Sequence, residues 1–148
     1  MPYEGMIAET VLINGHEGTQ IDAYLARPLG AGPVGSVVLI HHMPGWDAAS
    51  KEMARKLAYN GFATISPNLH FREGKGSPRK IALVYAKLVV CRTFARWAMS
   101  RLQRLPAKLT LRNGKVGLIG FCSGGRQTYL GACTLETLVP QSIAGAVE

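Results

Sequence analysis

The sequence contains no apolar run as long as a membrane helix requires, which is about 20 residues. Its opening letters, MPYEGMIAET, also lack the basic region and apolar core of a secretory signal. The few cysteines, Cys91, Cys122 and Cys133, are odd in number and spaced unlike any zinc motif. We therefore expect one cytoplasmic domain over residues 1–148, without a metal or a membrane partner, in which Cys91 and Cys133 are buried apolar side chains.

Acidic residues are scarce, and none occurs between residues 74 and 135. The chain has 17 Lys and Arg against 9 Asp and Glu, which gives a net charge of +8. Residues 79–112 carry +9 and no acid, so the remainder carries −1. Their pattern fits a surface helix with a solvated basic face; a helix that meets anionic lipid or nucleic acid, and a segment encoded out of frame, are the alternatives. We expect no nucleic-acid partner, because the aromatic interleaving of such modules is missing.

The remaining pattern alternates short apolar strands with helices. Strands are predicted over residues 6–13, 21–27, 36–40, 62–66, 116–119 and 142–147, and helices over residues 47–60 and 123–133. Alternation of strand and helix implies parallel strands with right-handed crossovers, whereas the turn-rich residues 14–18 join the first two strands as an antiparallel hairpin. The expected fold is a three-layer α/β domain with a mostly parallel sheet.

Capping residues and the spacing of apolar residues predict where the first helix begins and which face of each helix is buried. Asp47 is a favourable N-cap for the first helix, and Met53, Leu57 and their neighbours are expected on its inner face. In the second helix, Tyr129 and Leu130 are expected to face inward. Each helix would then cover the sheet with large apolar side chains.

The stretch KVGLIGFCSGG, residues 115–125, joins a buried strand to the start of a helix. Gly120 and Gly124 stand two residues before and after Cys122, as in a nucleophile elbow, where the sharp turn leaves no room for flanking side chains. The positive end of the helix dipole favours an anion there. A merely tight turn or a phosphate-binding loop is the alternative, but the G-x-G-x-x-G spacing of a dinucleotide site is missing.

A second group of polar residues follows the strand predicted at residues 36–40. HHMPGWD, residues 41–47, lies at its carboxyl end, where open α/β sheets bind ligands. The loop at residues 68–78 reaches the same edge from the next strand and contains Arg72. A guanidinium there can bind a substrate carboxylate in a bidentate pair, or it can simply be solvated.

Together these motifs resemble the dienelactone hydrolase family of α/β-hydrolases. The resemblance rests on GFCSGG with the preceding KVGLI, and on VVLIHHMPGWDAASKEMARKLAYNGFATISPNLHFR at residues 37–72. It implies a hydrolase that cleaves a lactone or carboxylic ester through Cys122, without a cofactor. It also implies an oxyanion hole made by the backbone amides of Ser123 and Met43, and substrate contacts from Arg72 and Trp46.

His42 departs from the pattern of the family, which usually has a glutamate near the resting thiol at the matching position. An imidazole at His42 can accept the proton of Cys122 and act catalytically, or it can form part of the pocket wall. The residue types alone leave both interpretations open.

The order nucleophile, acid, histidine that α/β-hydrolases share is not completed in this sequence. No histidine and no aspartate follow Cys122. We therefore expect a chain truncated before the catalytic aspartate and histidine, with the C-terminal strands missing. The sheet edge exposed in this way invites self-association. A catalytically silent α/β-hydrolase-like domain that binds a ligand or partner is the alternative function.

Overall fold

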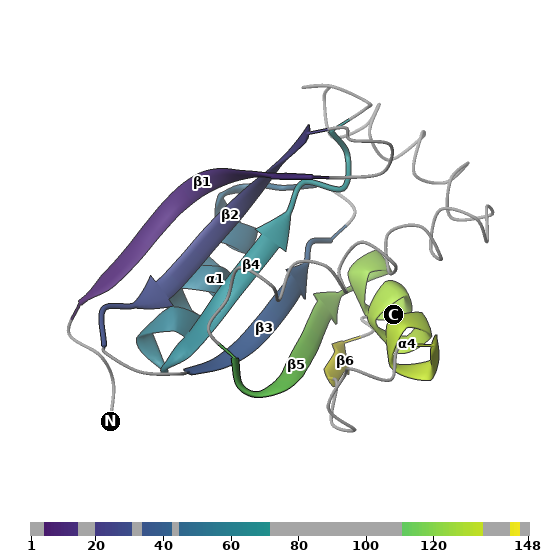
Figure 1. Ribbon diagram of the computed structural model, residues 1–148. Helices are drawn as coiled ribbons and strands as arrows, with labels where there is room; N and C mark the ends of the chain where they lie inside the picture. The colour runs from purple at the N-terminus through teal and green to yellow at the C-terminus, as the bar shows by residue number, and fades with distance from the viewer. Residues whose placement is uncertain are drawn as a thin grey trace.

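The computed structural model describes residues 5–14, 20–30, 34–42, 45–71, 111–134 and 143–145 (Figure 1). The elements are β1 (Met6–Asn14), β2 (Gln20–Pro28), β3 (Val34–Ile40), α1 (Ala48–Tyr59), β4 (Phe62–Pro67), β5 (Leu111–Phe121), α4 (Ser123–Thr134) and β6 (Ile143–Gly145). Most of the basic segment, together with Cys91, lies outside these residues. None of the described helices is long and apolar enough to cross a membrane.

The strands form one sheet in the order β1-β2-β4-β3-β5-β6. β1 pairs with β2 in antiparallel fashion from Met6↔Pro28 to Asn14↔Gln20, and β2 is also antiparallel to β4. The pairs β4 and β3, β3 and β5, and β5 and β6 are all parallel. This confirms the predicted α/β fold with a mostly parallel sheet and an N-terminal antiparallel pair, and it brings the carboxyl ends of β3, β4 and β5 to one edge.

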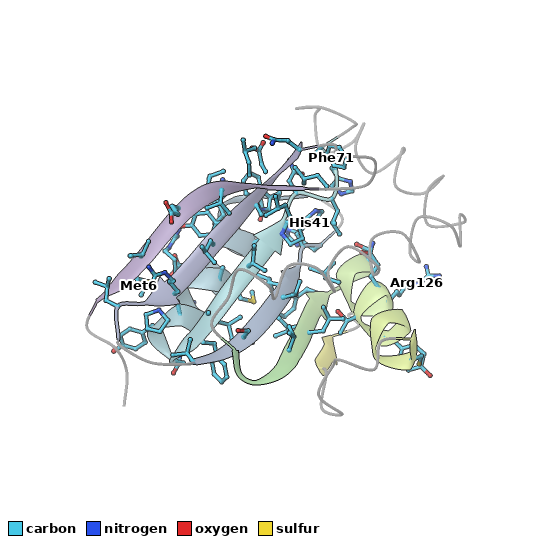
Figure 2. The ribbon with its side chains drawn as sticks, viewed as in Figure 1. Met6, His41, Phe71 and Arg126 are labelled. Atoms are coloured by element: carbon cyan, nitrogen blue, oxygen red, sulfur yellow. The ribbon has the colours of Figure 1, made fainter. Side chains whose placement is uncertain are left out.

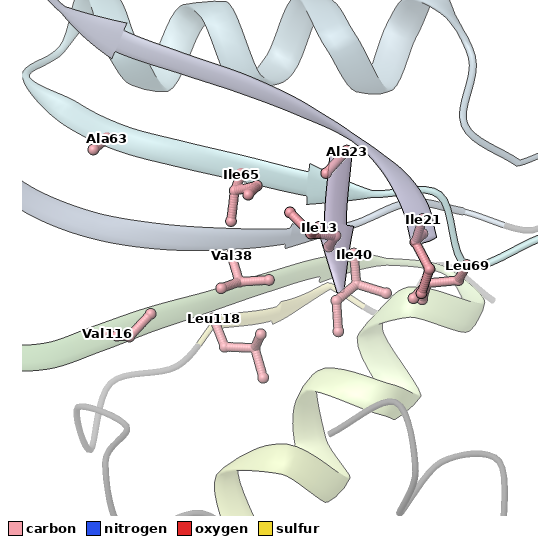
Figure 3. Packing of buried hydrophobic residues seen from close by; sticks show 10 residues of the cluster. All are labelled: Ile13, Ile21, Ala23, Val38, Ile40, Ala63, Ile65, Leu69, Val116 and Leu118. Atoms are coloured by element: carbon pink, nitrogen blue, oxygen red, sulfur yellow. The ribbon is translucent and has the colours of Figure 1, made fainter. Parts of the chain in front are cut away.

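Helices α1 and α4 cover opposite faces of the sheet (Figures 1 and 3). Side chains alternate between the faces along β3. Val38 and Ile40 belong to the cluster on the α4 side (Figure 3), and Leu39 belongs to the cluster with Ala54 and Ala58 of α1. All three are at most 1% exposed. The apolar run of β3 follows from this position, because a central parallel strand is buried on both faces.

Helix α1 begins and ends where its caps predict. The Asp47 carboxylate accepts the Ser50 backbone N–H at 2.9 Å, and Asn60 is the C-cap. The buried residues of the helix are Ser50, Ala54 and Ala58. Met53 packs against the core cluster beneath this helix, as predicted, although Met53 and Leu57 are only partly buried and the small residues beside them are the ones that are fully buried.

Helix α4 packs differently from the predicted helix. Tyr129 is 69% exposed and Cys133 is also exposed, so the predictions that these two side chains are buried are wrong. The side chains and glycines of this helix that are buried are Gly124, Gly125, Gln127 and Thr128, and of these Gly124 and Thr128 lie against Gly120 of β5. Small and polar residues occupy this face because the start of α4 lies too close to the strands for large apolar side chains.

We predict that Leu39→Ala lowers the free energy of unfolding by about 2 to 5 kcal/mol, because it leaves a cavity beneath α1. Leu12→Ala is the matched control: Leu12 lies on β1 and is 56% exposed, so its truncation should change stability by less than about 0.5 kcal/mol. Urea unfolding followed by circular dichroism measures both values. Equal losses for the two variants would contradict the burial of Leu39.

Candidate active site

Cys122 occupies the turn between β5 and α4 with a backbone φ of 53°. It has the only positive φ found for a residue other than glycine in the part of the chain that the structure describes. Left-handed backbone costs such a residue about 1 to 2 kcal/mol, so the neighbouring structure must impose it. The Gly125 N–H donates to the Cys122 carbonyl at 3.0 Å, which closes the turn, and the Cys122 side chain is exposed.

Two glycines allow the chain to turn this sharply. A Cβ atom at Gly120 would collide with the Gly124 carbonyl and with the Thr128 hydroxyl. A Cβ atom at Gly124 would lie 2.6 Å from the Ile40 carbonyl oxygen and 2.7 Å from that of His41. The first turn of α4 therefore rests directly on the backbone of β3 and β5, with no side chain between them.

His41 lies at the sheet edge where β3 and β4 end (Figure 2) and is 2% exposed. Its Nε2 accepts the Leu69 backbone N–H at 3.1 Å, and its Nδ1 lies 2.9 Å from the His42 carbonyl oxygen. Since a carbonyl only accepts and an N–H only donates, the proton of the neutral ring is on Nδ1. His41 thus joins the loop after β3 to the loop after β4.

Burial lowers the pKa of His41 from its ordinary value of 6.5 to about 4, although the hydrogen bond to the His42 carbonyl opposes the shift. The ring of His70, which is itself 4% exposed, packs against it with the ring centroids 4.7 Å apart. Both nitrogens of His41 are engaged at neutral pH. At neutral pH it is therefore a structural residue with no nitrogen left to act as a base.

His42 has a different environment, because its side chain is 32% exposed. Its Nε2 lies 2.8 Å from Oδ2 of Asp47, while Oδ1 of Asp47 caps helix α1. Burial alone would raise the pKa of Asp47, but hydrogen bonds from the Ser50 N–H and from His42 outweigh it and lower the pKa. Asp47 is consequently a carboxylate at neutral pH, and each of its oxygens has a donor.

The loop between His42 and Asp47 is shaped for this pairing. Gly45 has a φ of 108°, its N–H donates to the His42 carbonyl at 3.0 Å, and its carbonyl accepts the Asp47 N–H at 3.1 Å. These two bonds fold the chain back, so that a carboxylate five residues after the histidine meets its ring. Sequence reasoning identified Asp47 only as a helix cap. The sequence signal that could have indicated the pairing with His42 was a histidine and a capping aspartate separated by a short turn that contains glycine.

A small pocket of about 40 Å³ lies between the end of β3, the start of α1 and the end of β5. It is lined by Leu39, His41, His42, Ala49, Ser50, Met53 and Phe121. This volume exceeds the roughly 10 to 15 Å³ needed for one water molecule but is too small for an ester substrate. The pocket brings His42 together with Phe121, the residue immediately before Cys122.

The remaining predicted site residues fall into two groups. Trp46 is held by the fold: its indole N–H donates to the Ser66 carbonyl at 2.9 Å, and the Lys51 ammonium lies 4.0 Å from its ring centroid. Its role in substrate binding stays a prediction. Met43 and Arg72 lie outside the described residues. Across the ranges that are described, no group of three or more His, Cys, Asp or Glu side chains is placed to hold a metal ion.

The mixed sheet, its central parallel strands and helices on both faces define the class of this protein as the α/β-hydrolase fold. A profile of the dienelactone hydrolase family matches residues 21–144. The chain belongs to the dienelactone hydrolase family.

Individual relatives agree with this assignment. A Synechocystis sp. protein named "Putative carboxymethylenebutenolidase" is 30% identical over 149 residues, which cover 95% of this chain and 60% of the relative. The crystal structure of a "Putative Dienelactone Hydrolase" from Klebsiella pneumoniae is 27% identical, with a TM-score of 0.76 over 91% of this chain and 57% of that chain. The crystal structure of a dienelactone hydrolase-like promiscuous phosphotriesterase from metagenomic libraries is 25% identical. Its TM-score is 0.78, and the match covers 90% of this chain and 56% of that chain. The chain spans less than two thirds of the length of these proteins.

We predict that His41 makes the stability of the domain sensitive to acid. The pKa of His41 is about 4 in the folded chain and 6.5 in the unfolded chain. Between these two pH values the unfolded chain binds a proton at His41, whereas the folded chain does not. The free energy of unfolding should fall by about 3 kcal/mol between pH 6.5 and pH 4, and this contribution should be constant above and below that window.

Comparison with His41→Asn isolates this contribution, because every other titrating group is common to both proteins. Urea unfolding of each protein at pH 7.5, 5.5 and 4 gives the two pH dependences. The variant should be less stable at pH 7.5 but should lose less stability on acidification. Parallel pH profiles would show that His41 does not titrate as its burial requires.

Proposed function

We propose that the chain forms the nucleophile-bearing part of a hydrolase that cleaves a carboxylic ester or lactone through Cys122. The observation that carries this proposal is an exposed thiol held at a φ of 53° between a central strand and a helix. A strained backbone at a position fixed by two obligatory glycines is typical of a functional residue. The family assignment and the lactone hydrolase name of the Synechocystis relative support the substrate class.

The proposed reaction proceeds through a thioester. The Cys122 thiolate adds to the carbonyl carbon, the C–O bond to the alkoxide breaks, and the alkoxide takes a proton as it leaves. For a lactone the leaving oxygen stays attached to the acyl group. Water then adds to the thioester, the C–S bond breaks, and the acid and the thiol are regenerated.

The negative charge that develops on the carbonyl oxygen needs nearby N–H donors. Ser123 is the first residue of α4, and the first four N–H groups of a helix lack partners within the helix. We assign the oxyanion hole to the amide of Ser123 and that of Met43, and we keep Arg72 and Trp46 as proposed substrate contacts. The chemistry uses only a thiol, a base and water, and requires no cofactor. A cytoplasmic location and self-association through a sheet edge also stay predictions.

The test is a burst experiment with p-nitrophenyl acetate. The wild-type chain should release about one equivalent of nitrophenolate in a fast phase, because each Cys122 is acylated once before slower turnover. Cys122→Ala should abolish this phase, whereas Cys133→Ala should retain it, since Cys133 is an exposed thiol at the other end of α4. A burst that survives Cys122→Ala would contradict the assignment of the nucleophile, and its absence from the wild-type chain would favour a silent binding domain.

A further inference from the structure

The three described histidines at the carboxyl edge of the sheet are not equivalent. His41 is buried and uses both ring nitrogens to join two loops. His70 is 4% exposed and packs against the ring of His41. His42 is the only one of these three with a partly exposed ring, and its Nε2 lies 2.8 Å from Oδ2 of Asp47. A base that meets substrate and water has to be accessible, so His42 is the candidate.

The hydrogen bond to Asp47 decides which nitrogen of His42 is basic. An ionised carboxylate can only accept, so Nε2 must carry the hydrogen that it donates to Oδ2 across 2.8 Å. The lone pair of the neutral ring is therefore on Nδ1. The carboxylate of Asp47 holds the ring by its other nitrogen, Nε2.

The sheet places the segments that carry His42 and Cys122 at the same edge. β3 and β5 are parallel neighbours, and the last residues that pair are Ile40 and Gly120. His42 and Cys122 each follow two residues later on the same edge. His42 also shares the small pocket with Phe121, the residue before Cys122.

We propose that Asp47 is a positioning residue that fixes the tautomer of His42, so that Nδ1 of His42 serves as the base for the Cys122 thiol. This inference rests on the proposed function and assigns its base. The proton moves from Sγ of Cys122 to Nδ1, from Nδ1 to the leaving alkoxide, and in the second half of the reaction from water to Nδ1 and then back to sulfur. Every proton taken up is returned, and Asp47 stays ionised throughout.

Asp47→Asn separates this role from helix capping, because asparagine is as good an N-cap as aspartate. Its side-chain oxygen can still accept the Ser50 N–H, but its amide now donates toward His42 and reverses the tautomer. Glu52→Gln is the matched control: it removes an exposed carboxylate from the same helix, where Glu52 pairs with Arg55. Equal thermal midpoints for the two variants would show that the cap is intact.

The first measurement is the ¹⁵N spectrum of the histidine side chains at pH 8, with His42→Gln identifying the signals of His42. The wild-type chain should show His42 protonated on Nε2, and Asp47→Asn should move that hydrogen to Nδ1. A wild-type ring protonated on Nδ1 would overturn the inference whatever the variants do.

The second measurement is the rate at which iodoacetamide alkylates Cys122, read by mass spectrometry relative to Cys133 in the same sample. Asp47→Asn and His42→Gln should each lower this ratio by about tenfold or more, and Glu52→Gln should leave it unchanged. An unchanged ratio in Asp47→Asn would overturn the role of Asp47. If the nitrophenyl ester burst still requires Cys122, only this inference fails; if the burst survives Cys122→Ala, the proposed function fails with it.

Discussion

The site depends on the direct contact between the first turn of α4 and the backbone of β3 and β5. Gly120 and Gly124 leave no space for a Cβ atom, and the carbonyl groups of Ile40 and His41 fill the place where one would stand. Because nothing separates helix from strand, the residue between them is forced into left-handed backbone and its side chain is turned outward. One packing constraint thus sets both the strain at Cys122 and its exposure.

The same edge of the sheet is organised by hydrogen bonds that cross between loops. His41 ties the loop after β3 to Leu69 in the loop after β4, and Gly45 folds the chain so that Asp47 meets His42. Two adjacent histidines consequently receive opposite environments: one is buried and neutral, and the other is partly exposed beside a carboxylate. Burial and partners, rather than residue type, separate the structural imidazole of His41 from the imidazole that we propose as the base.

Local sequence patterns were sufficient to predict most of the fold. The apolar run of β3 and the capping aspartate of α1 determine those elements from within a few residues, and the strand-to-helix turn at Cys122 follows from its glycines. The outward position of Tyr129 did not follow from apolar spacing, because the inner face of α4 is set by how closely the helix approaches the sheet. The pairing of Asp47 with His42 depends on the backbone of Gly45, which a residue pattern does not specify.

The outward position of the Cys122 sulfur has a consequence for the surroundings in which such a protein can work. A thiol that an ester can reach is equally open to peroxide, and oxidation to a sulfenic acid removes the electron pair that would attack a carbonyl. A serine hydroxyl on the same turn would not be oxidised in this way. The choice of sulfur therefore links the chemistry of this turn to the redox state of its environment.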